Sequence, residues 1–246
     1  MIQGSDWRMV ARRRVAALAM VIAAGALAPQ CTAAPSPPTA PSPPAQPPTS
    51  RATSATAPPA PPATTVRPVT AAELGASWRP DCPVEPGQLR RVAVNHIGMD
   101  GQTHRGELIV NEELVAEVIA VFDQLYQQRF PIEKIRTVDH YPAAADELSM
   151  EDNNTSAFNC RRIRGSVDWS LHAYGRAIDL NPLLNPSVDP SGTFEPTNAV
   201  AYLDRSRTDP GMLHDGDPAT HVFTDRGWRW GGYWKSPIDY QHFERP

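Results

Sequence analysis

The chain has 246 residues, 27 prolines, three cysteines and a formal net charge of −4. This small negative charge gives no electrostatic basis for binding nucleic acid or for a polybasic membrane patch, so we expect no nucleic-acid partner. Three cysteines are too few for a disulfide-dense scaffold or for a zinc finger built from cysteine alone.

Residues 1–34 have the pattern of an export segment. Arginines near the N-terminus precede an uncharged run of 14 residues, 15–28, which suits a signal-peptide core and is short for a spanning helix of about 20 residues. Three outcomes stay open: cleavage within about 31–34, lipid attachment at Cys31, or retention as an uncleaved anchor. Each places the folded part outside the cytoplasm, secreted or tethered to the envelope membrane through the N-terminus only.

Residues 35–77 are predicted to form a disordered stalk. Thirteen prolines fall between Pro35 and Pro68, among Ala, Ser and Thr. Such a composition buries too little apolar surface to offset the entropy lost on ordering. Pro-rich chains form extended spacers, although disordered filler would look the same. The remaining residues, 78–246, are enough for a single compact domain.

The first predicted elements of this domain are a hairpin and a helix. Strands at 89–97 and 108–110 flank the turn signal Asp100-Gly101. Asn111 is a good N-cap, and apolar residues then recur at helical spacing, which predicts a helix over 111–129 with one face on a core.

The later elements are shorter. The pattern predicts a strand at 132–138, helices at 197–205 and 217–226, and closing strands at 228–232 and 240–243. Strands and helices do not alternate strictly, and we find no internal repeat. The fold class is therefore predicted to be α+β, with a small, largely antiparallel sheet flanked by helices.

Cys82 and Cys160 are the two cysteines outside the export segment. An exported protein meets an oxidising compartment, so we expect them to form a disulfide rather than remain as two buried thiols. The bridge would close a loop of 78 residues, which corresponds to a stabilisation on the order of 4 kcal/mol.

Residues with catalytic potential concentrate in two stretches, 170–179 and 234–244. His172, Asp179 and His242 form a ligand set that catalytic zinc accepts, with the fourth position left to water. Asp239 precedes His242 by three residues and could act as general base on that water. Taken singly, each has an ordinary structural interpretation: a hydrogen-bonded loop histidine, a turn aspartate, a packed strand histidine.

The first stretch resembles the S-x-H-x-x-G-x-A-x-D signature of the zinc peptidases that include D-Ala-D-Ala carboxypeptidases and dipeptidases and phage L-Ala–D-Glu endopeptidases. The pair Asp239-x-x-His242 resembles their second motif, about 60 residues further on. The resemblance covers roughly residues 80–246. It implies a zinc domain of the hedgehog and D-Ala-D-Ala-peptidase type, with His172, Asp179 and His242 as ligands and Asp239 as base. Family members often carry Glu at the base position, one methylene longer.

The resemblance also implies an upstream arginine that contacts substrate near the scissile carbonyl. Arg161 is our choice, and Arg162 and Arg164 are alternatives. Ser170 matches the serine of the signature, and Asn159 is a second candidate for substrate binding. Both polar residues suit turn and cap formation equally well.

Aromatic and histidine residues outside the motifs carry weaker signals. Trp228, Trp230 and Trp234 either floor a substrate groove or belong to the core, and the sequence does not decide between these. The remaining histidines, which have no motif support, are expected to be structural or exposed: His96, His104, His140, His214 and His221.

The sequence therefore predicts a monomeric, extracytoplasmic zinc metallopeptidase that hydrolyses peptidoglycan stem peptides. Whether it is D-Ala-D-Ala carboxypeptidase-like or L-Ala–D-Glu endopeptidase-like stays open. Two alternatives remain: a non-catalytic zinc-containing domain that binds cell wall or protein, and a structural domain without metal.

Overall fold

The computed structural model describes residues 61–246. The predicted export segment and most of the predicted stalk lie outside the described residues. Within 61–246, no helix combines the length and apolar character needed to cross a membrane.

The largest sheet has the strand order β1-β2-β3. β2 (Leu89–Ile97) pairs antiparallel with β3 (Thr103–Asn111), and Gly101, at φ 74°, forms the turn between them. β2 has the predicted bounds. β3 begins earlier than predicted. Its first residues, from Thr103 onward, pair with β2 through backbone hydrogen bonds. They are exposed and polar, so no apolar alternation in the sequence indicated a strand there.

The folded part begins before residue 78. β1 (Thr65–Pro68) pairs with β2, and α1 (Ala71–Leu74) follows, capped by Thr70 and Glu73 in a reciprocal capping box. Leu74 is fully buried and packs in a small cluster with Leu89. The predicted stalk of 35–77 is thus too long at its C-terminal end. Its Pro- and Thr-rich composition indicated disorder, although it includes a few apolar side chains and a helix cap that order residues from β1 onward.

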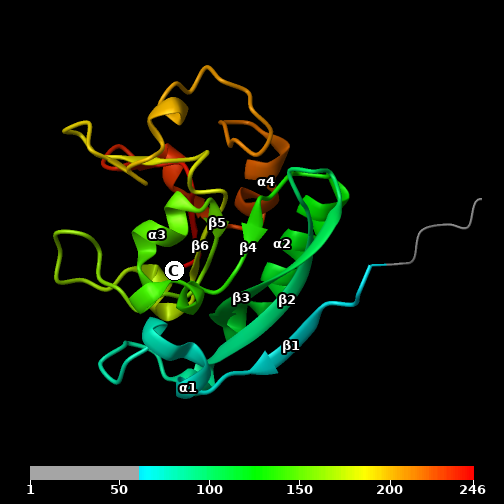
Figure 1. Cartoon of the computed structure of the whole chain (residues 1–246), viewed down its shortest axis with the longest axis vertical. Coiled ribbons are helices and arrows are strands. Elements are labelled where there is room, and N and C mark those ends of the chain that lie inside the picture. The colour runs from blue at the N-terminus through cyan, green and yellow to red at the C-terminus, as the bar shows by residue number, and fades with distance from the viewer. Residues whose placement is uncertain (1–60) are drawn as a thin grey trace, which may run out of the picture. The chain divides into compact units, whose positions relative to one another are not determined.

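Helix α2 (Val115–Gln127) packs against the sheet, as Figure 1 shows. Asn111 caps the preceding 3-10 turn, and buried side chains of α2 such as Phe122 join β-strand residues such as Val92 in the main core. The predicted helix over 111–129 is therefore present, with its first turn tightened. Its apolar stripe fixes the helix against the sheet.

The rest of the domain consists of short elements on small sheets. Two have three strands: β6 (Ala177–Asp179), β11 (His242–Glu244) and β9 (Arg229–Trp230) form one, and β10 (Ile238–Asp239), β7 (Ser187–Val188) and β8 (Phe194–Glu195) form the other. A parallel pair joins β4 (Lys134–Ile135) to β5 (Asn154–Thr155), and the remaining helices are α3 (Asp146–Glu151) and α4 (Pro218–Thr224). The predicted α+β class is confirmed.

Several later elements are shorter than predicted or of another type. The closing strand expected at 228–232 is only β9, and residues Gly231–Tyr233 form a 3-10 turn. The strand expected at 132–138 shrinks to β4, and the helix expected at 197–205 is only a 3-10 turn, Val200–Tyr202. Val200 is 65% exposed and Leu203 is 37% exposed. The apolar residues of that segment therefore do not form a buried stripe, so nothing stabilises a longer helix there.

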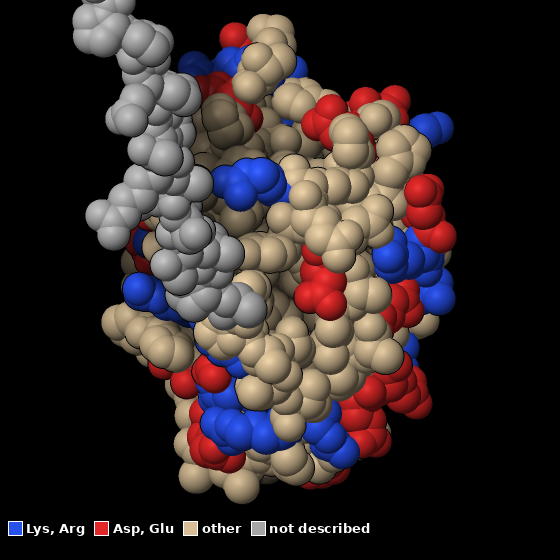
Figure 2. Space-filling model, turned by 90° about the vertical axis from the view of Figure 1, so that its right-hand side faces the viewer, with Lys and Arg blue, Asp and Glu red and all other residues tan. Residues whose placement is uncertain are grey.

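Figure 2 shows Lys and Arg side chains and Asp and Glu side chains near one another over the described part of one face. That part offers no large area of positive charge that would attract a polyanion.

Cys82 and Cys160 form a disulfide, with their Cα atoms 5.8 Å apart. The bridge packs beside Trp78 and Phe158 in the cluster that also buries Leu74. We expect reduction to lower the melting temperature by roughly 10 °C, because a long loop is released in the unfolded state. Thermal unfolding with and without reductant measures this shift, and zinc content should be the same in both samples. Free labelling of both thiols in native, non-reduced protein would contradict the bridge.

Candidate metal centre and cleft

Three short elements carry the predicted metal ligands. His172 lies in the 3-10 turn Leu171–Tyr174, Asp179 ends β6, and His242 begins β11. Gly175 stands between the first two at φ 68°, and a Cβ there would meet the backbone nitrogen of Asn111 at 2.6 Å. Glycine is therefore required at this reversal, which lets the turn and β6 present both side chains to one point.

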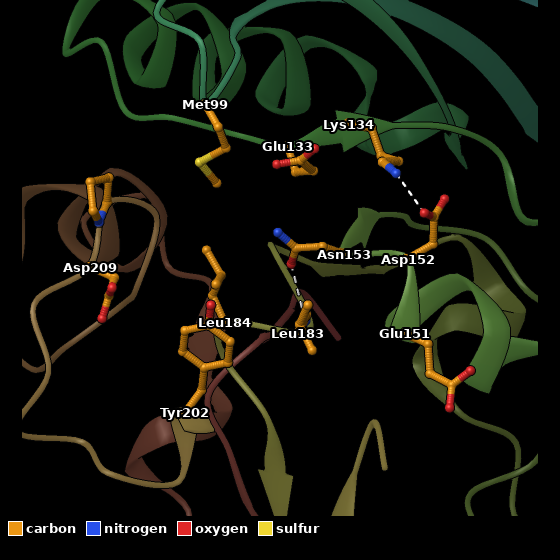
Figure 3. Close-up of a pocket in the computed structure, with 11 residues that line it drawn as sticks. Met99, Glu133, Lys134, Glu151, Asp152, Asn153, Leu183, Leu184, Tyr202 and Asp209 are labelled. Carbon is orange, nitrogen blue, oxygen red and sulfur yellow. Dashed lines mark hydrogen bonds and ion pairs between the residues drawn. The ribbon is translucent and has the colours of Figure 1, made fainter. Parts of the chain in front are cut away.

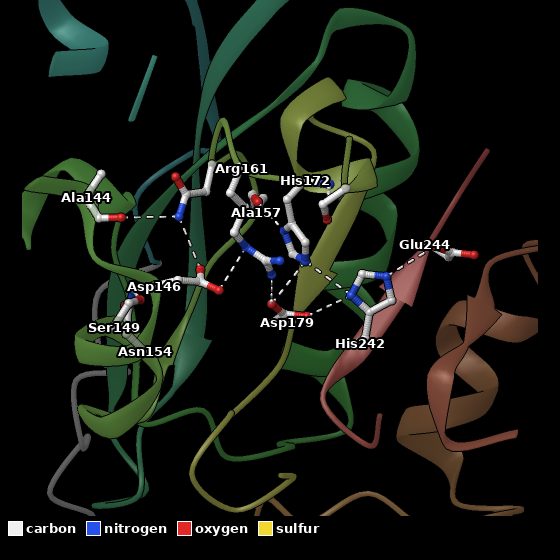
Figure 4. A network of polar contacts seen from close by, with 12 residues as sticks. Ala144, Asp146, Ser149, Asn154, Ala157, Arg161, His172, Asp179, His242 and Glu244 are labelled. Carbon is white, nitrogen blue, oxygen red and sulfur yellow. Dashed lines mark hydrogen bonds and ion pairs between the residues drawn. The ribbon is translucent and has the colours of Figure 1, made fainter. Parts of the chain in front are cut away.

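Strand register brings the third ligand to the same point. β11 pairs antiparallel with β6, with His242 directly opposite Asp179. Residues directly opposite one another on neighbouring strands project to the same face of the sheet. All three side chains are buried, and Figure 4 shows them converging from the turn and the two strands.

The distances within this group fit a zinc ion. His172 Nε2 lies 3.1 Å from His242 Nδ1. His172 Nε2 is 3.0 Å from Asp179 Oδ2, and His242 Nδ1 is 3.0 Å from Asp179 Oδ1. Tetrahedral zinc with bonds of about 2.0–2.1 Å separates its ligand atoms by about 3.3 Å. A small expansion would admit the ion. Among residues 61–246, no other group of three or more His, Cys, Asp or Glu residues has potential ligand atoms this close together.

Each histidine has its second ring nitrogen bonded away from the centre. His172 Nδ1 donates to the Ala157 carbonyl oxygen, and His242 Nε2 lies 3.3 Å from Glu244 Oε2. A carbonyl and a carboxylate only accept, so both outward nitrogens carry protons and both inward nitrogens can present lone pairs. Such outer contacts orient metal-binding imidazoles and fix their tautomers.

The buried charges of the centre depend on one another. Burial alone would raise the pKa of Asp179, but His172 and His242 hold it well below its usual range. Burial alone would lower the pKa of His242, yet the hydrogen bonds that its ring donates to Asp179 and Glu244 raise it to about 10. A cation at this centre would take the place of a proton, as metal binding to imidazole and carboxylate generally does.

Asp239 ends β10 at the edge of this centre. It is half-buried, and its Oδ1 atom is buried without a hydrogen-bond partner among the described residues. Burial raises the pKa of Asp239 to about 6, and the negative charge of Asp179 also raises it, against the lowering by His242 and Arg161. A carboxylate with such a pKa and an unused acceptor suits general base catalysis near neutral pH.

Of the three candidate arginines, Arg161 lies at the centre. Its Nε is 2.8 Å from Asp146 Oδ2, and its Nη2 is 3.8 Å from Asp179 Oδ2. Arg162 instead stacks on Trp169, 4.0 Å from the ring centroid, and Arg164 pairs with Glu195. The structure therefore favours Arg161 as the arginine nearest the predicted ligands.

Ser170 and Asn159 have different surroundings. Ser170 lines the cleft beside the centre, and its hydroxyl accepts from the backbone nitrogen of His172 at 3.3 Å. Asn159 does not line the cleft, because its amide nitrogen donates to the Ala144 carbonyl at 3.3 Å and to Asp146 Oδ1 at 3.2 Å. In the structure Asn159 holds Asp146 beside Arg161, and its predicted contact with substrate stays a prediction.

A cleft of about 640 Å³ opens beside the centre. Among its lining residues are Arg161, Ser170, Asp239 and His242, together with residues from β7 and β8. Trp234 lines it as well, with its ring centroid 5.2 Å from that of His242. Trp228 and Trp230 are buried in the main core. Of the two positions that the sequence left open, Trp234 therefore lines the cleft, whereas Trp228 and Trp230 belong to the core.

A second cavity, of about 520 Å³, lies elsewhere in the domain (Figure 3). None of the predicted site residues lines it, and two of its polar side chains are engaged locally: Lys134 pairs with Asp152 at 2.6 Å, and Asn153 accepts from the Leu183 backbone at 3.1 Å. The cleft beside the three ligands is therefore the candidate functional site.

Residues 164–245 match the protein-family model described as D-alanyl-D-alanine carboxypeptidase. This match confirms the resemblance carried by the two motifs, and it supports a peptidase. The matched segment contains the three predicted ligands and Asp239 but begins after Arg161. No curated protein and no solved structure matches the chain.

Sequence reasoning missed two supporting carboxylates of this peptidase-like centre. Asp146, at the start of α3, pairs with Arg161, and no motif marks it. Glu244 contacts His242 with one oxygen, at 3.3 Å, and Arg229 with the other, at 2.6 Å. The spacing of two residues along a strand, which places Glu244 on the same face as His242, was the available signal.

We expect Glu244→Gln to weaken zinc binding about tenfold, because it removes the charge that orients His242. Turnover at saturating zinc should change only a few-fold. Competition with a chromophoric chelator measures the affinity, and Glu112→Gln, an exposed carboxylate paired with Arg90, is the control. Unchanged zinc affinity would show that the contact does not support the metal.

Proposed function

We propose that this protein is a zinc-dependent peptidase that hydrolyses peptidoglycan stem peptides outside the cytoplasm. The observation that carries the proposal is the convergence of three ligand side chains beside Asp239, a carboxylate with an unused acceptor on the same cleft. The family match supports the reaction class, and the disulfide supports an oxidising compartment. We further propose that the domain acts as a monomer.

His172, Asp179 and His242 would hold the zinc ion. When bound, zinc lowers the pKa of a coordinated water towards neutrality and polarises a substrate carbonyl. Three protein ligands would leave the fourth position of the ion to water or substrate, as catalytic zinc sites require. Their burial and their outward hydrogen bonds keep the ligand atoms in place before substrate arrives.

Asp239 would accept the proton of the attacking water and pass it to the nitrogen of the leaving amine. Its position at the end of β10 keeps the carboxylate beside His242 without bonding to it. Because Oδ1 accepts no hydrogen bond from residues 61–246, it can take up the proton without breaking a hydrogen bond to that part of the chain. This is what general base catalysis requires.

Arg161 would stabilise negative charge that develops on the carbonyl oxygen of the scissile bond. Asp146 fixes the guanidinium through Nε, and Asn159 fixes Asp146 in turn. A donor held in place before the reaction contributes more than one that must reorganise during it.

The test is digestion of purified peptidoglycan by the zinc-loaded full-length protein, with fragments identified by mass. The proposal expects cleavage of one type of stem-peptide bond and none with Asp239→Asn. Wall binding without any cleavage, with zinc in place, would instead establish the non-catalytic binding domain.

A further inference from the structure

A cross-strand row of side chains leads away from Asp239 along the cleft. In the sheet β10-β7-β8, Asp239 is opposite Ser187, and Ser187 is opposite Glu195. All three line the cleft. Neighbouring strands lie about 4.8 Å apart, so the backbone of Glu195 is about 10 Å from that of Asp239. That distance corresponds to about three residues of extended peptide.

The part of the cleft lined by Asp189 and Glu195 carries an excess of negative charge. Arg164, from the hairpin 162–169 that an Arg162–Trp169 bridge closes, pairs with Glu195. Two carboxylates and one guanidinium leave a formal charge of −1 among these lining groups. The Arg164 contact shows that a cationic group from outside the sheet fits against Glu195.

The two partners of this ion pair differ in how firmly they are held. The Glu195 side chain is 32% exposed and belongs to a strand, whereas the Arg164 side chain is 73% exposed on its hairpin. Exposed ion pairs contribute little to stability. Arg164 can therefore leave Glu195 at low cost when another cation arrives.

We propose that Glu195 binds an ammonium group of the peptide, about three residues from the bond next to Asp239. The identification of that bond as the one that is cut rests on the proposed function. The ammonium site is argued from the charged residues that line the cleft. Asp189 contributes negative charge, although Ser191 and Thr193 occupy one of its oxygens.

Among the described residues that line the cleft, carboxylates outnumber arginines. The two arginines are already paired, Arg161 with Asp146 and Arg164 with Glu195. A peptide recognised through an amino group and cut at an internal bond fits these charges better than a peptide recognised through its terminal carboxylate.

The experiment measures binding rather than turnover. Two stem-type peptides, identical except that the side-chain amine is free in one and acetylated in the other, are titrated into zinc-loaded, full-length Asp239→Asn protein. We expect the free-amine peptide to bind roughly tenfold more tightly, as charge-assisted hydrogen bonds usually provide. Adding Glu195→Gln should bring the ratio close to one. Asp168→Asn, which removes a carboxylate of the hairpin that does not line the cleft, should leave the ratio unchanged.

Further arms keep the outcome decisive. Arg164→Gln should preserve or raise the ratio because it removes the competing cation, and high salt should shrink it. Equal binding of both peptides, a ratio that survives Glu195→Gln, or a ratio lost with Arg164→Gln would each overturn the inference. If Glu195→Gln does not fold, Glu195→Asp and the salt series replace it. Glu195→Asp keeps the charge and should keep most of the preference for the free-amine peptide, and high salt should reduce that preference. Failure of the wild type to cut either peptide would count against the proposed function only.

Discussion

Replacing Asp239 with asparagine is expected to lower hydrolysis of wall peptides by at least ~100-fold while one zinc remains bound. Asparagine keeps the size of the side chain but cannot accept a proton at the pH of the reaction. Asp239 lies outside the group of three converging ligand side chains, so zinc should be retained. The loss should be in kcat, because the substrate-lining residues of the cleft are unchanged.

Glu244→Gln is the matched comparison, since both changes remove one carboxylate that lines the same cleft. Asp239→Asn should lose turnover and keep zinc, whereas Glu244→Gln should weaken zinc and keep turnover once zinc is saturating. Zinc content and initial rates are measured on the same samples. Normal turnover by Asp239→Asn together with an inactive Glu244→Gln at saturating zinc would reverse the two assignments.

The second large effect concerns the ligands. His172→Ala or His242→Ala should reduce bound zinc from about one ion per chain to almost none, because two remaining ligands hold zinc weakly in competition with water. Each variant also takes away one of the two imidazoles that hold the Asp179 carboxylate in its charged form. A lower melting temperature should accompany the loss, as expected for an unpaired buried charge.

Metal analysis after dialysis measures this effect, and His221→Ala is the control. His221 is an exposed histidine on α4 that faces Asp225 rather than the centre. It should retain zinc and activity. Stoichiometric zinc in His172→Ala would place the metal elsewhere in the protein.

Local sequence patterns were sufficient for the elements that bury a regular stripe. The alternation in 89–97 and the helical spacing after Asn111 predicted β2 and α2, because their side chains face one large core. The motif at 170–179 and His242 likewise marked the three side chains that converge in the structure. The sequence did not show that β6 and β11 are adjacent, which is what places His242 against Asp179.

Other parts of the site depend on contacts between distant segments with no local signature. Asp146 contacts Arg161 only because α3 packs beside the segment that contains Arg161. The hydrogen bond between Asn159 and Asp146 depends on the same packing, so it could not be predicted from the sequence. Ser187 and Glu195 reach the cleft through strands of two residues each. Elements this short are fixed by tertiary packing, so neither propensity nor periodicity predicts them.

The most direct test is a zinc titration of the chelator-stripped, full-length protein, with release of peptide fragments from purified peptidoglycan measured at each step. The stripped protein should be inactive, and activity should rise in proportion to added zinc and level off at about one equivalent per chain. Full activity in stripped protein, or no cleavage at any zinc level with one ion bound, would contradict the assignment of this site as a zinc peptidase.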